Sequence, residues 1–161
     1  MFRGPMFSGK STHLLNIPAS GRVLTLKKSG DNRYSDSNTL TTHDGEKGRC
    51  ISVENLKDVD ISGYSVVRID EGQFFGDIDK VLDWCKTARV YISALNMDYE
   101  KKPFENISRI IDRCEVVKCY SKCTVCKGRA WYTRRIINSC ERILIGSVGM
   151  YEPRCHECFD K

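Results

Sequence analysis

The sequence of 161 residues predicts an α/β fold, in which a parallel sheet carries helices on both faces and a small cysteine-rich part follows. Three observations lead to this prediction. Residues 4–12 match the phosphate-binding pattern G-x-x-x-x-G-K-[ST] in full, short apolar runs alternate with helical stripes after them, and two Cys-x-x-Cys pairs lie near the carboxyl end. We therefore expect a P-loop nucleotide-binding domain over residues 1–118 and a zinc-binding subdomain over residues 119–161.

The phosphate loop is the first element, and each fixed position in it has a physical role. Its glycines let backbone N–H groups curl around a β-phosphate, while Lys10 brings a cation to the β- and γ-phosphate oxygens. The hydroxyl of Ser11 can ligate Mg²⁺. The alternative is a chance glycine-rich turn at a helix start. Pro18 and Gly21 predict that the helix after the loop ends soon after Leu15.

The middle of the chain alternates between strand and helix patterns, which is typical of the crossover units of a parallel sheet. Apolar runs predict strands at 22–27, 64–69, 90–95 and 115–119. Helical spacing predicts helices over 77–86, with a stripe of Ile78, Val81, Leu82 and Cys85, and over 104–113, with Ile107, Ile110 and Ile111. Residues 28–47 are polar and rich in turn formers, so we expect a loop that a ligand orders.

Two adjacent carboxylates, Asp70 and Glu71, end the second of these strands. An acidic residue at the end of a strand in a P-loop protein commonly holds Mg²⁺, so we assign Asp70 and Ser11 to magnesium. Glu71 at the same rim can accept a proton from a hydroxyl that attacks the γ-phosphate. The alternative is that Glu71 caps a loop or pairs with an arginine.

Nine cysteines divide into four candidate metal ligands and five others. Cys123 with Cys126, and Cys155 with Cys158, form two identical pairs separated by 28 residues, 127–154, a pattern typical of a tetrahedral Zn²⁺ site. Four thiolates leave no open position, so the zinc would be structural. The alternative is two unrelated free pairs. The other cysteines are predicted to be small buried hydrophobic residues: Cys50, Cys85, Cys114, Cys119 and Cys140.

The composition limits the class of protein and its compartment. The net charge of +5 and pI near 8.7 suit phosphate-bearing ligands as well as nucleic acid. No apolar run is long enough to cross a bilayer and no signal pattern opens the chain, so we expect a cytoplasmic protein. Basic and aromatic residues surround the cysteine pairs and leave a nucleic-acid-binding module as an alternative: Lys118, Lys122, Lys127, Arg129, Trp131, Tyr132, Arg134 and Arg135.

Taken together and in order, these motifs resemble the thymidine kinase family of the cytosolic, zinc-containing type. The resemblance covers nearly the whole chain. It rests on residues 4–12, Asp31-Asn32-Arg33-Tyr34-Ser35, Thr42-His43-Asp44, Asp70-Glu71-Gly72-Gln73-Phe74-Phe75, Lys102-Pro103-Phe104 and the two cysteine pairs.

The resemblance implies transfer of the ATP γ-phosphate to the 5′-hydroxyl of thymidine. It implies that Glu71 accepts the proton, that Lys10 stabilises the transferred group and that Arg33 helps to hold phosphates. ATP and its Mg²⁺ would be bound by Gly4, Pro5, Met6, Phe7, Ser8, Gly9, Lys10, Ser11, Thr12, Asp31, Asn32, Arg33, Asp70, Glu71, Gly72 and Gln73. Thymidine would be bound by Met6, Phe74, Leu95, Tyr99, Phe104, Tyr151 and a zinc-tethered lasso containing Arg142, Ile143, Leu144, Ile145 and Gly146.

The resemblance also implies a homo-oligomer, a tetramer in the family, inhibition by the end product dTTP, and no membrane partner. On residue type alone, two of the four aromatic residues Phe74, Phe75, Tyr99 and Phe104 would be plain core. Four features depart from the family pattern: residues 1–3 leave little of a first strand, the first helix is short, Tyr99 replaces a phenylalanine, and Gly146-Ser147 replaces a double glycine. Nucleic-acid binding by a catalytically impaired P-loop protein remains the second hypothesis.

Overall fold

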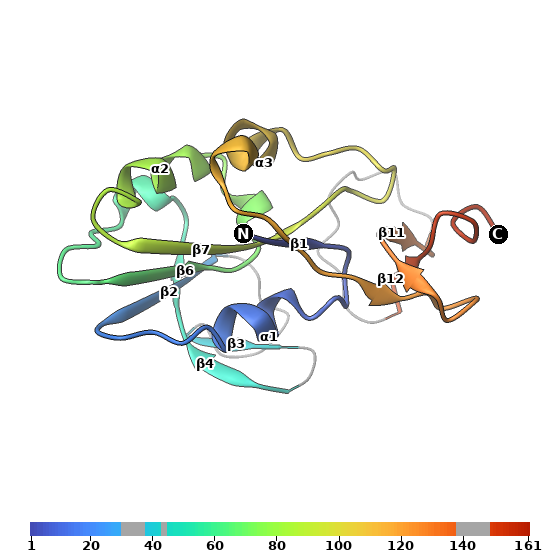
Figure 1. The fold of residues 1–161 in the computed structure, drawn as a ribbon, viewed down its shortest axis with the longest axis horizontal. Helices are drawn as coiled ribbons and strands as arrows, with labels where there is room; N and C mark the ends of the chain where they lie inside the picture. Colours follow the sequence, from blue (N-terminus) through green and yellow to red (C-terminus); the bar gives the residue numbers. More distant parts are fainter. Residues whose placement is uncertain (30–37, 43–44, 138–148) are drawn as a thin grey trace.

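The structure is a computed structural model that describes residues 1–29, 38–42, 45–137 and 149–161 (Figure 1). Its centre is a sheet of six parallel strands in the order β5-β2-β6-β7-β1-β8. The predicted α/β class with a parallel sheet is therefore confirmed. The strands are β1 (Phe2–Gly4), β2 (Val23–Lys28), β5 (Ile51–Val53), β6 (Val66–Ile69), β7 (Arg89–Leu95) and β8 (Val117–Lys118).

The first strand is short, as expected, but it occupies an interior position in the sheet. Phe2 pairs with Ser93 of β7 on one side and with Val117 of β8 on the other. Two further backbone bonds extend these ladders, because Asn96 N donates to Gly4 O at 3.1 Å and Cys119 N donates to Arg3 O at 2.8 Å. The residues of β1 thus place the start of the phosphate loop between two neighbouring strands.

The helices are short and lie on both faces of the sheet, with α2 and α3 together on one side and α1 on the other (Figure 1). Helix α1 ends before Pro18, which fits the predicted early stop. Each of the other two predicted helices contains a 3₁₀ turn, so regular α-helix covers only part of the predicted range. The helices are α1 (Lys10–Leu15), α2 (Val81–Trp84) and α3 (Glu105–Ile110), and the 3₁₀ turns are Leu56–Asp58, Gly72–Phe74, Ile78–Lys80 and Ile111–Arg113.

The main hydrophobic core lies between the sheet and helices α2 and α3. Alternate residues of β2, β6 and β7 supply it, because successive side chains of a strand point to opposite faces. Phe75 and Phe104 belong to this core, so two of the four aromatic residues near the site are core residues, as residue type alone predicted. The strand residues in the core are Leu24, Leu26, Val67, Ile69, Ile92 and Ala94.

One predicted core position is wrong. Cys85 is exposed, whereas Trp84 is buried. The 3₁₀ turn before α2 and the single helical turn that follows leave Cys85 at the helix end, and Trp84, three residues after buried Val81, takes the inward position. Cys50 and Cys119 are buried and Cys114 is half-buried, while Cys140 lies outside the described residues.

The prediction of a loop over 28–47 needs a second correction. Lys28 still belongs to β2, and β3 (Thr39–Thr41) pairs antiparallel with β4 (Lys47–Arg49). Polar residues form this hairpin, and for that reason hydrophobic periodicity did not reveal it. Leu40 of β3 is buried, and residues 30–37 and 43–44 lie outside the described ranges.

The cysteine-rich part folds into two small antiparallel sheets. β9 (Ser121–Lys122) pairs with β10 (Arg129–Ala130), and β11 (Tyr132–Arg135) pairs with β12 (Tyr151–Arg154). We call the second pair the β11–β12 ribbon. β8, which ends at Lys118, is the last strand of the main sheet along the chain, and the domain boundary at residue 118 stays a prediction. Residues 138–148, which connect β11 to β12 and include the predicted lasso, lie outside the described residues.

The end of β1 gives the first testable prediction. A Cβ atom at Gly4 would lie 2.1 Å from the backbone oxygen of Cys119, which the β1–β8 ladder holds in place. We expect Gly4→Ala to destabilise the protein by about 3 kcal/mol or more in thermal unfolding. Gly76→Ala is the matched control, because a Cβ there meets no atom within 4 Å. Equal melting temperatures of the two variants would contradict the tight packing of Gly4.

Candidate active site

The phosphate loop runs from the end of β1 to the start of α1. Hydrogen bonds from its own polar side chains to its backbone stabilise it. Ser8 Oγ donates to Pro5 O at 2.8 Å, and Lys10 Nζ donates to the same oxygen at 2.6 Å. Lys10 is only 7% exposed, so its ammonium group is held within the loop. This places a desolvated cation where the pattern requires one for the β- and γ-phosphate oxygens.

Two residues of the loop adopt left-handed backbone conformations. Gly9, which caps α1, has φ 71°, and Phe7 has φ 61°. A phenylalanine in this region costs roughly 1 kcal/mol, so other contacts must hold the loop in shape. The cysteine-rich part supplies two of them: Ser121 Oγ donates to Phe7 O at 2.9 Å, and Met6 N donates to Thr133 Oγ1 at 3.0 Å.

Asp70 lies at the end of β6 and joins the loop to the sheet. Its Oδ1 accepts a hydrogen bond from Ser11 Oγ at 2.8 Å and another from Ser93 Oγ of β7. Burial raises the pKa of Asp70 to about 6, and the neighbouring Glu71 carboxylate adds to the rise. The Ser93 and Ser11 hydroxyl groups and the charge of Lys10 act in the opposite direction.

These oxygen atoms fit a magnesium ion. The hydroxyl of Ser11 and the carboxylate of Asp70 are ligand types that Mg²⁺ prefers, and they lie within hydrogen-bond distance of each other. The raised pKa of Asp70 also fits, because a buried carboxylate is stabilised by a nearby cation. The two residues that sequence analysis assigned to magnesium are thus brought together in space.

Glu71, the residue after Asp70, has left-handed backbone angles, φ 52° and ψ 47°. Its N–H donates to Ser93 Oγ at 3.3 Å, and its Oε2 accepts a hydrogen bond from Gln73 Nε2. Gln73 is itself held, since its Oε1 accepts from Leu95 N at 3.0 Å. The Glu71 carboxylate is therefore oriented by a side chain that the next strand fixes.

Sequence analysis missed Ser93, which contacts both acidic residues. A signal was present, because functional groups in parallel sheets gather at the carboxyl ends of the strands, and Ser93 is the only hydroxyl residue in the otherwise apolar second half of β7. It also missed Asn96, whose Nδ2 donates to Trp131 O at 2.6 Å and so joins the loop after β7 to the cysteine-rich part.

The predicted thymidine-contacting residues fall into three groups. Met6, Phe74, Leu95, Tyr99 and Tyr151 are half-buried, as the walls of a pocket would be. Phe104 is buried in the main core. Outside the described residues lie Arg142, Ile143, Leu144, Ile145 and Gly146, together with the predicted phosphate contacts Asp31, Asn32 and Arg33.

Arg135, a residue that sequence analysis did not assign to the site, connects Tyr99 with Tyr151. Its guanidinium carbon lies 3.8 Å from the centroid of the Tyr99 ring. Its Nη2 and Nε donate to Tyr151 Oη at 2.8 and 3.2 Å. Two predicted pocket residues that are far apart in the sequence are thus brought to one side chain.

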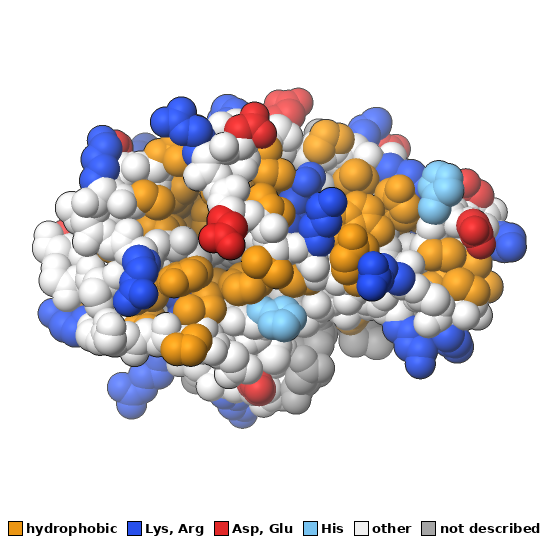
Figure 2. Space-filling view, in the orientation of Figure 1, with side chains coloured by type: hydrophobic (Ala, Val, Ile, Leu, Met, Phe, Trp, Pro, Cys, Tyr) orange, Lys and Arg blue, Asp and Glu red, His pale blue; other side chains and the backbone are white. Residues whose placement is uncertain are grey.

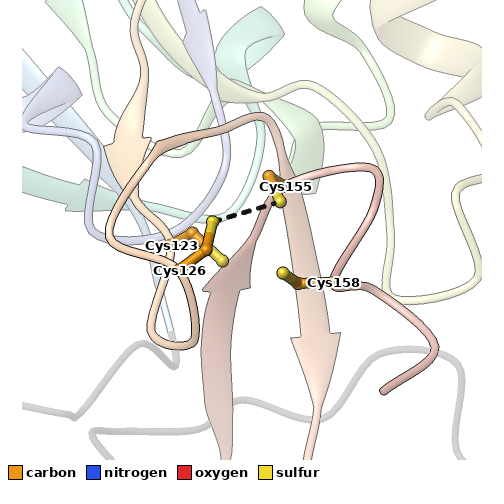
Figure 3. A group of neighbouring side chains, drawn as sticks. All are labelled: Cys123, Cys126, Cys155 and Cys158. Carbon is orange, nitrogen blue, oxygen red and sulfur yellow. Dashed lines mark hydrogen bonds between the residues drawn. The ribbon is translucent and has the colours of Figure 1, made fainter.

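The four predicted zinc ligands form one cluster (Figure 3). Cys123 and Cys126 come from the turn between β9 and β10, and Cys155 and Cys158 follow β12. Their sulfur atoms all lie within 4.8 Å of one another, and Cys126 Sγ lies 3.6 Å from Cys155 Sγ. Four sulfur atoms at this spacing suit a tetrahedral Zn²⁺ with no position left for substrate.

The protonation behaviour of the cluster also fits a cation. Burial raises the pKa of Cys123, but backbone N–H groups of Cys126, Cys155 and Val125 outweigh it and lower the pKa to about 6. The pKa of Cys158 is raised to about 12, first by its hydrogen bond with Cys155, then by burial and by the other sulfur atoms. Several thiolates so close together require a positive charge among them.

The charge on the face of the molecule drawn in Figure 2 is mixed. In Figure 2, Lys and Arg side chains are spread over the whole face among hydrophobic and acidic ones. Such a distribution does not favour a continuous track for a nucleic-acid backbone. In the described ranges, each helix is too short or too polar to cross a membrane.

The buried carboxyl of Asp70 gives a prediction on pH. Below about pH 4 it is protonated in the folded and unfolded states alike, whereas above about pH 6 the folded state must bury its charge. A rise of the pKa from 3.8 to about 6 corresponds to about 3 kcal/mol at neutral pH. We therefore expect Asp70→Asn to raise the melting temperature in magnesium-free buffer at pH 7 and to lose this advantage at pH 4. An equal gain at both pH values would show that ionisation is not its cause.

Comparison with known proteins gives the family. The thymidine kinase family model matches residues 1–159. The thymidine kinases of vaccinia virus (strain Western Reserve) and of monkeypox virus are each 37% identical over 169 residues, which cover 97% of this chain and 93% of the relative. Thymidine kinase 1 of Dictyostelium discoideum is 34% identical over 172 residues, covering 98% of this chain and 75% of the relative. The chain thus belongs to the thymidine kinase family.

Proposed function

We propose that the protein transfers the γ-phosphate of ATP to the 5′-hydroxyl of thymidine, giving dTMP and ADP for DNA precursor synthesis by salvage. Membership of the thymidine kinase family supports the reaction. The observation in the structure that carries the proposal is the hydrogen bond between Ser11 Oγ and Asp70 Oδ1, at 2.8 Å. It brings the phosphate loop next to the Asp70–Glu71 pair, which a protein that only binds phosphate groups has no need for.

ATP would bind with its phosphates in the loop of residues 4–12. Lys10 would stabilise the charge on the transferred phosphoryl group, and its burial strengthens that interaction. A magnesium ion held by Ser11 and Asp70 would supply further charge neutralisation at the phosphates. Residues 31–33, including Arg33, and residues 70–73 would complete the ATP site.

Glu71 is the proposed proton acceptor for the 5′-hydroxyl. A general base must be held within reach of the proton that it abstracts, and the hydrogen bond from Gln73 Nε2 fixes the direction of the Glu71 carboxylate. The N–H of Glu71 is meanwhile held by Ser93 Oγ, which also binds Asp70. Ser93 therefore holds both the proposed base, Glu71, and the proposed metal ligand, Asp70.

Thymidine would lie between the two parts of the chain. The half-buried side chains of Met6, Phe74, Leu95, Tyr99 and Tyr151 would surround the base, with Phe104 behind them in the core. Residues 142–146 would close over it as a lasso between the two strands of the β11–β12 ribbon. Enclosure of the reacting groups limits the hydrolysis of ATP by water.

The zinc centre would be structural and would hold the start of the lasso. We further propose a homo-oligomer inhibited by dTTP, as the family resemblance implies, in the cytoplasm, where a reducing environment keeps the four cysteines available for zinc. Neither the family nor the mixed charge on the face drawn in Figure 2 favours the alternative of a catalytically impaired nucleic-acid-binding protein.

The proposed function is tested by assaying phosphate transfer from ATP with Mg²⁺ to each of the four common deoxynucleosides, with zinc measured on the same sample. We expect strong preference for thymidine at one zinc per chain. A folded, zinc-loaded protein that binds ATP but phosphorylates no deoxynucleoside would overturn the proposal.

Glu71 gives a prediction on turnover. Glu71→Gln keeps the size of the side chain and removes its capacity to accept a proton, so we expect kcat to fall by about 10²-fold or more. ATP affinity should change little. Glu54→Gln is the control, because Glu54 is an exposed carboxylate that forms an ion pair with Lys28. Unchanged turnover in Glu71→Gln would remove Glu71 from its proposed role.

Cys155 gives a prediction on the zinc site. Cys155→Ser replaces one of four thiolates and follows directly after β12, so we expect loss of zinc and a raised KM for thymidine. Cys85→Ser is the control, since Cys85 is exposed and lies outside the cluster. Normal zinc content together with a normal KM in Cys155→Ser would contradict the proposed anchoring of the lasso.

A further inference from the structure

We propose that Arg135 and Lys101 are positioning residues, which clamp the turn carrying Tyr99 to the β11–β12 ribbon and so hold Tyr99 and Tyr151 as fixed walls of the nucleoside pocket. The inference rests on the proposed function for the identity of the nucleoside. Neither residue was predicted from the sequence to belong to the site. Both connect the cysteine-rich part with the loop after β7 through contacts between a cation and an aromatic ring.

The first half of the clamp is Arg135, the last residue of β11. In the ribbon it stands opposite Tyr151, the first residue of β12. Its guanidinium group donates two hydrogen bonds to Tyr151 Oη, while its carbon lies 3.8 Å from the Tyr99 ring centroid. A planar guanidinium can stack on one ring and donate from its edge to another group at the same time, which an ammonium group cannot do.

The second half is Lys101, in the turn that carries Tyr99. Its Nζ lies 5.3 Å from the ring centroid of Tyr132 in β11 and 3.9 Å from that of Phe159. Asp160 Oδ2 lies 3.9 Å from the same nitrogen. Arg135 of the ribbon thus contacts the ring of Tyr99 in the turn. In the other direction, Lys101 of the turn contacts two rings of the cysteine-rich part.

The turn itself is tightly defined. Asp98 Oδ1 accepts hydrogen bonds from Glu100 N at 3.0 Å and from Lys102 N at 2.8 Å. Lys101 has φ 65°, in the left-handed region that favours glycine. A lysine kept in this conformation indicates that contacts of its side chain compensate for the backbone strain. The clamp supplies such contacts.

The same strand also contacts the phosphate loop. Thr133, two residues before Arg135, accepts the hydrogen bond from Met6 N. Residues two apart in a strand point to the same side, so Thr133 and Arg135 present one side of β11 to the two segments that would bind thymidine. The ribbon therefore fixes two walls of the pocket relative to each other.

This arrangement predicts which kinetic constant depends on Arg135. The residue acts on Tyr99 and Tyr151, the proposed walls, and leaves the carboxylates Asp70 and Glu71 in place. Walls that are already fixed reduce the ordering required when the nucleoside binds. Loss of Arg135 should therefore raise KM for thymidine with much less effect on kcat or on KM for ATP.

The test compares Arg135→Met, Arg135→Lys and Arg129→Met in the full chain with zinc bound. Arg129 is the matched control, because its guanidinium carbon lies 4.6 Å from the Tyr120 ring centroid, a contact of the same kind in the same part of the chain. For Arg135→Met we expect KM and the directly measured Kd for thymidine to rise about tenfold, with kcat and KM for ATP within about threefold of wild type. KM and Kd for thymidine in Arg135→Lys should lie between those of Arg135→Met and wild type. Arg129→Met should match wild type.

Lys101→Met tests the other half of the clamp. It keeps an unbranched side chain and removes the charge, so we expect a rise of about threefold in KM for thymidine and an unchanged zinc content. Three results would each overturn the inference. The first is an equal rise of KM for thymidine in Arg135→Met and Arg129→Met. The others are a fall of kcat at constant KM in Arg135→Met, or an unchanged Kd for thymidine in that variant.

Two further measurements keep the result interpretable. If Arg135→Met fails to fold, Tyr151→Phe removes only the hydroxyl that accepts from Arg135, and an unchanged KM in that variant would overturn the inference. If wild type neither binds nor phosphorylates thymidine, the proposed function fails. Thymidine turnover by wild type together with an unaffected Arg135→Met would overturn the clamp alone.

Discussion

The carboxylate of Asp70 is the group on which the geometry of the active site depends. Its Oδ1 accepts hydrogen bonds from Ser11, on the first turn of α1, and from Ser93, on β7. Three elements that are distant in sequence are thereby tied to one buried atom. Because burial makes the charge unfavourable, Asp70 destabilises the folded protein at neutral pH, and a nearby cation relieves that effect. The interaction that shapes the site would thus also favour the proposed binding of magnesium with ATP.

The short first strand lies inside the sheet and leads directly into the phosphate loop. Phe2 and Arg3 pair on both sides and Gly4 pairs with β7, so their backbone bonds are made within the sheet and not at its edge. The loop is then supported from beyond the sheet as well, through Ser121 on Phe7 and Thr133 on Met6. The phosphate loop is therefore held by contacts from both parts of the chain.

Sequence was sufficient wherever function depends on local spacing. The phosphate loop and Asp70 with Glu71 were predicted correctly as neighbours in space, because each motif sets the distances between its own residues. The four cysteines were predicted as one cluster for a different reason, since two identical pairs together supply the four ligands of a tetrahedral zinc site. Ser93 and Arg135 were missed, because their roles arise from the pairing register of β7 with β6 and of β11 with β12. The same limit explains Cys85, whose exposure depends on a 3₁₀ turn before α2 that apolar spacing alone does not reveal.

Zinc binding by the four cysteines would stabilise the cysteine-rich part, in addition to its proposed role of tethering the lasso. Among the described residues of the cysteine-rich part, the buried hydrophobic cluster consists of Cys123, Ala130 and Cys158, with Cys155 packed against it. So little apolar surface cannot offset the conformational entropy of more than thirty described residues, which is lost at roughly 1 to 2 kcal/mol each. Binding of a metal by four thiolates can supply the missing free energy. Because Cys155 follows β12 directly, such metal bonds would also help to hold Tyr151 in its contact with Arg135. Folding of the cysteine-rich part and the order of the proposed nucleoside pocket would therefore both depend on metal binding by the four cysteines.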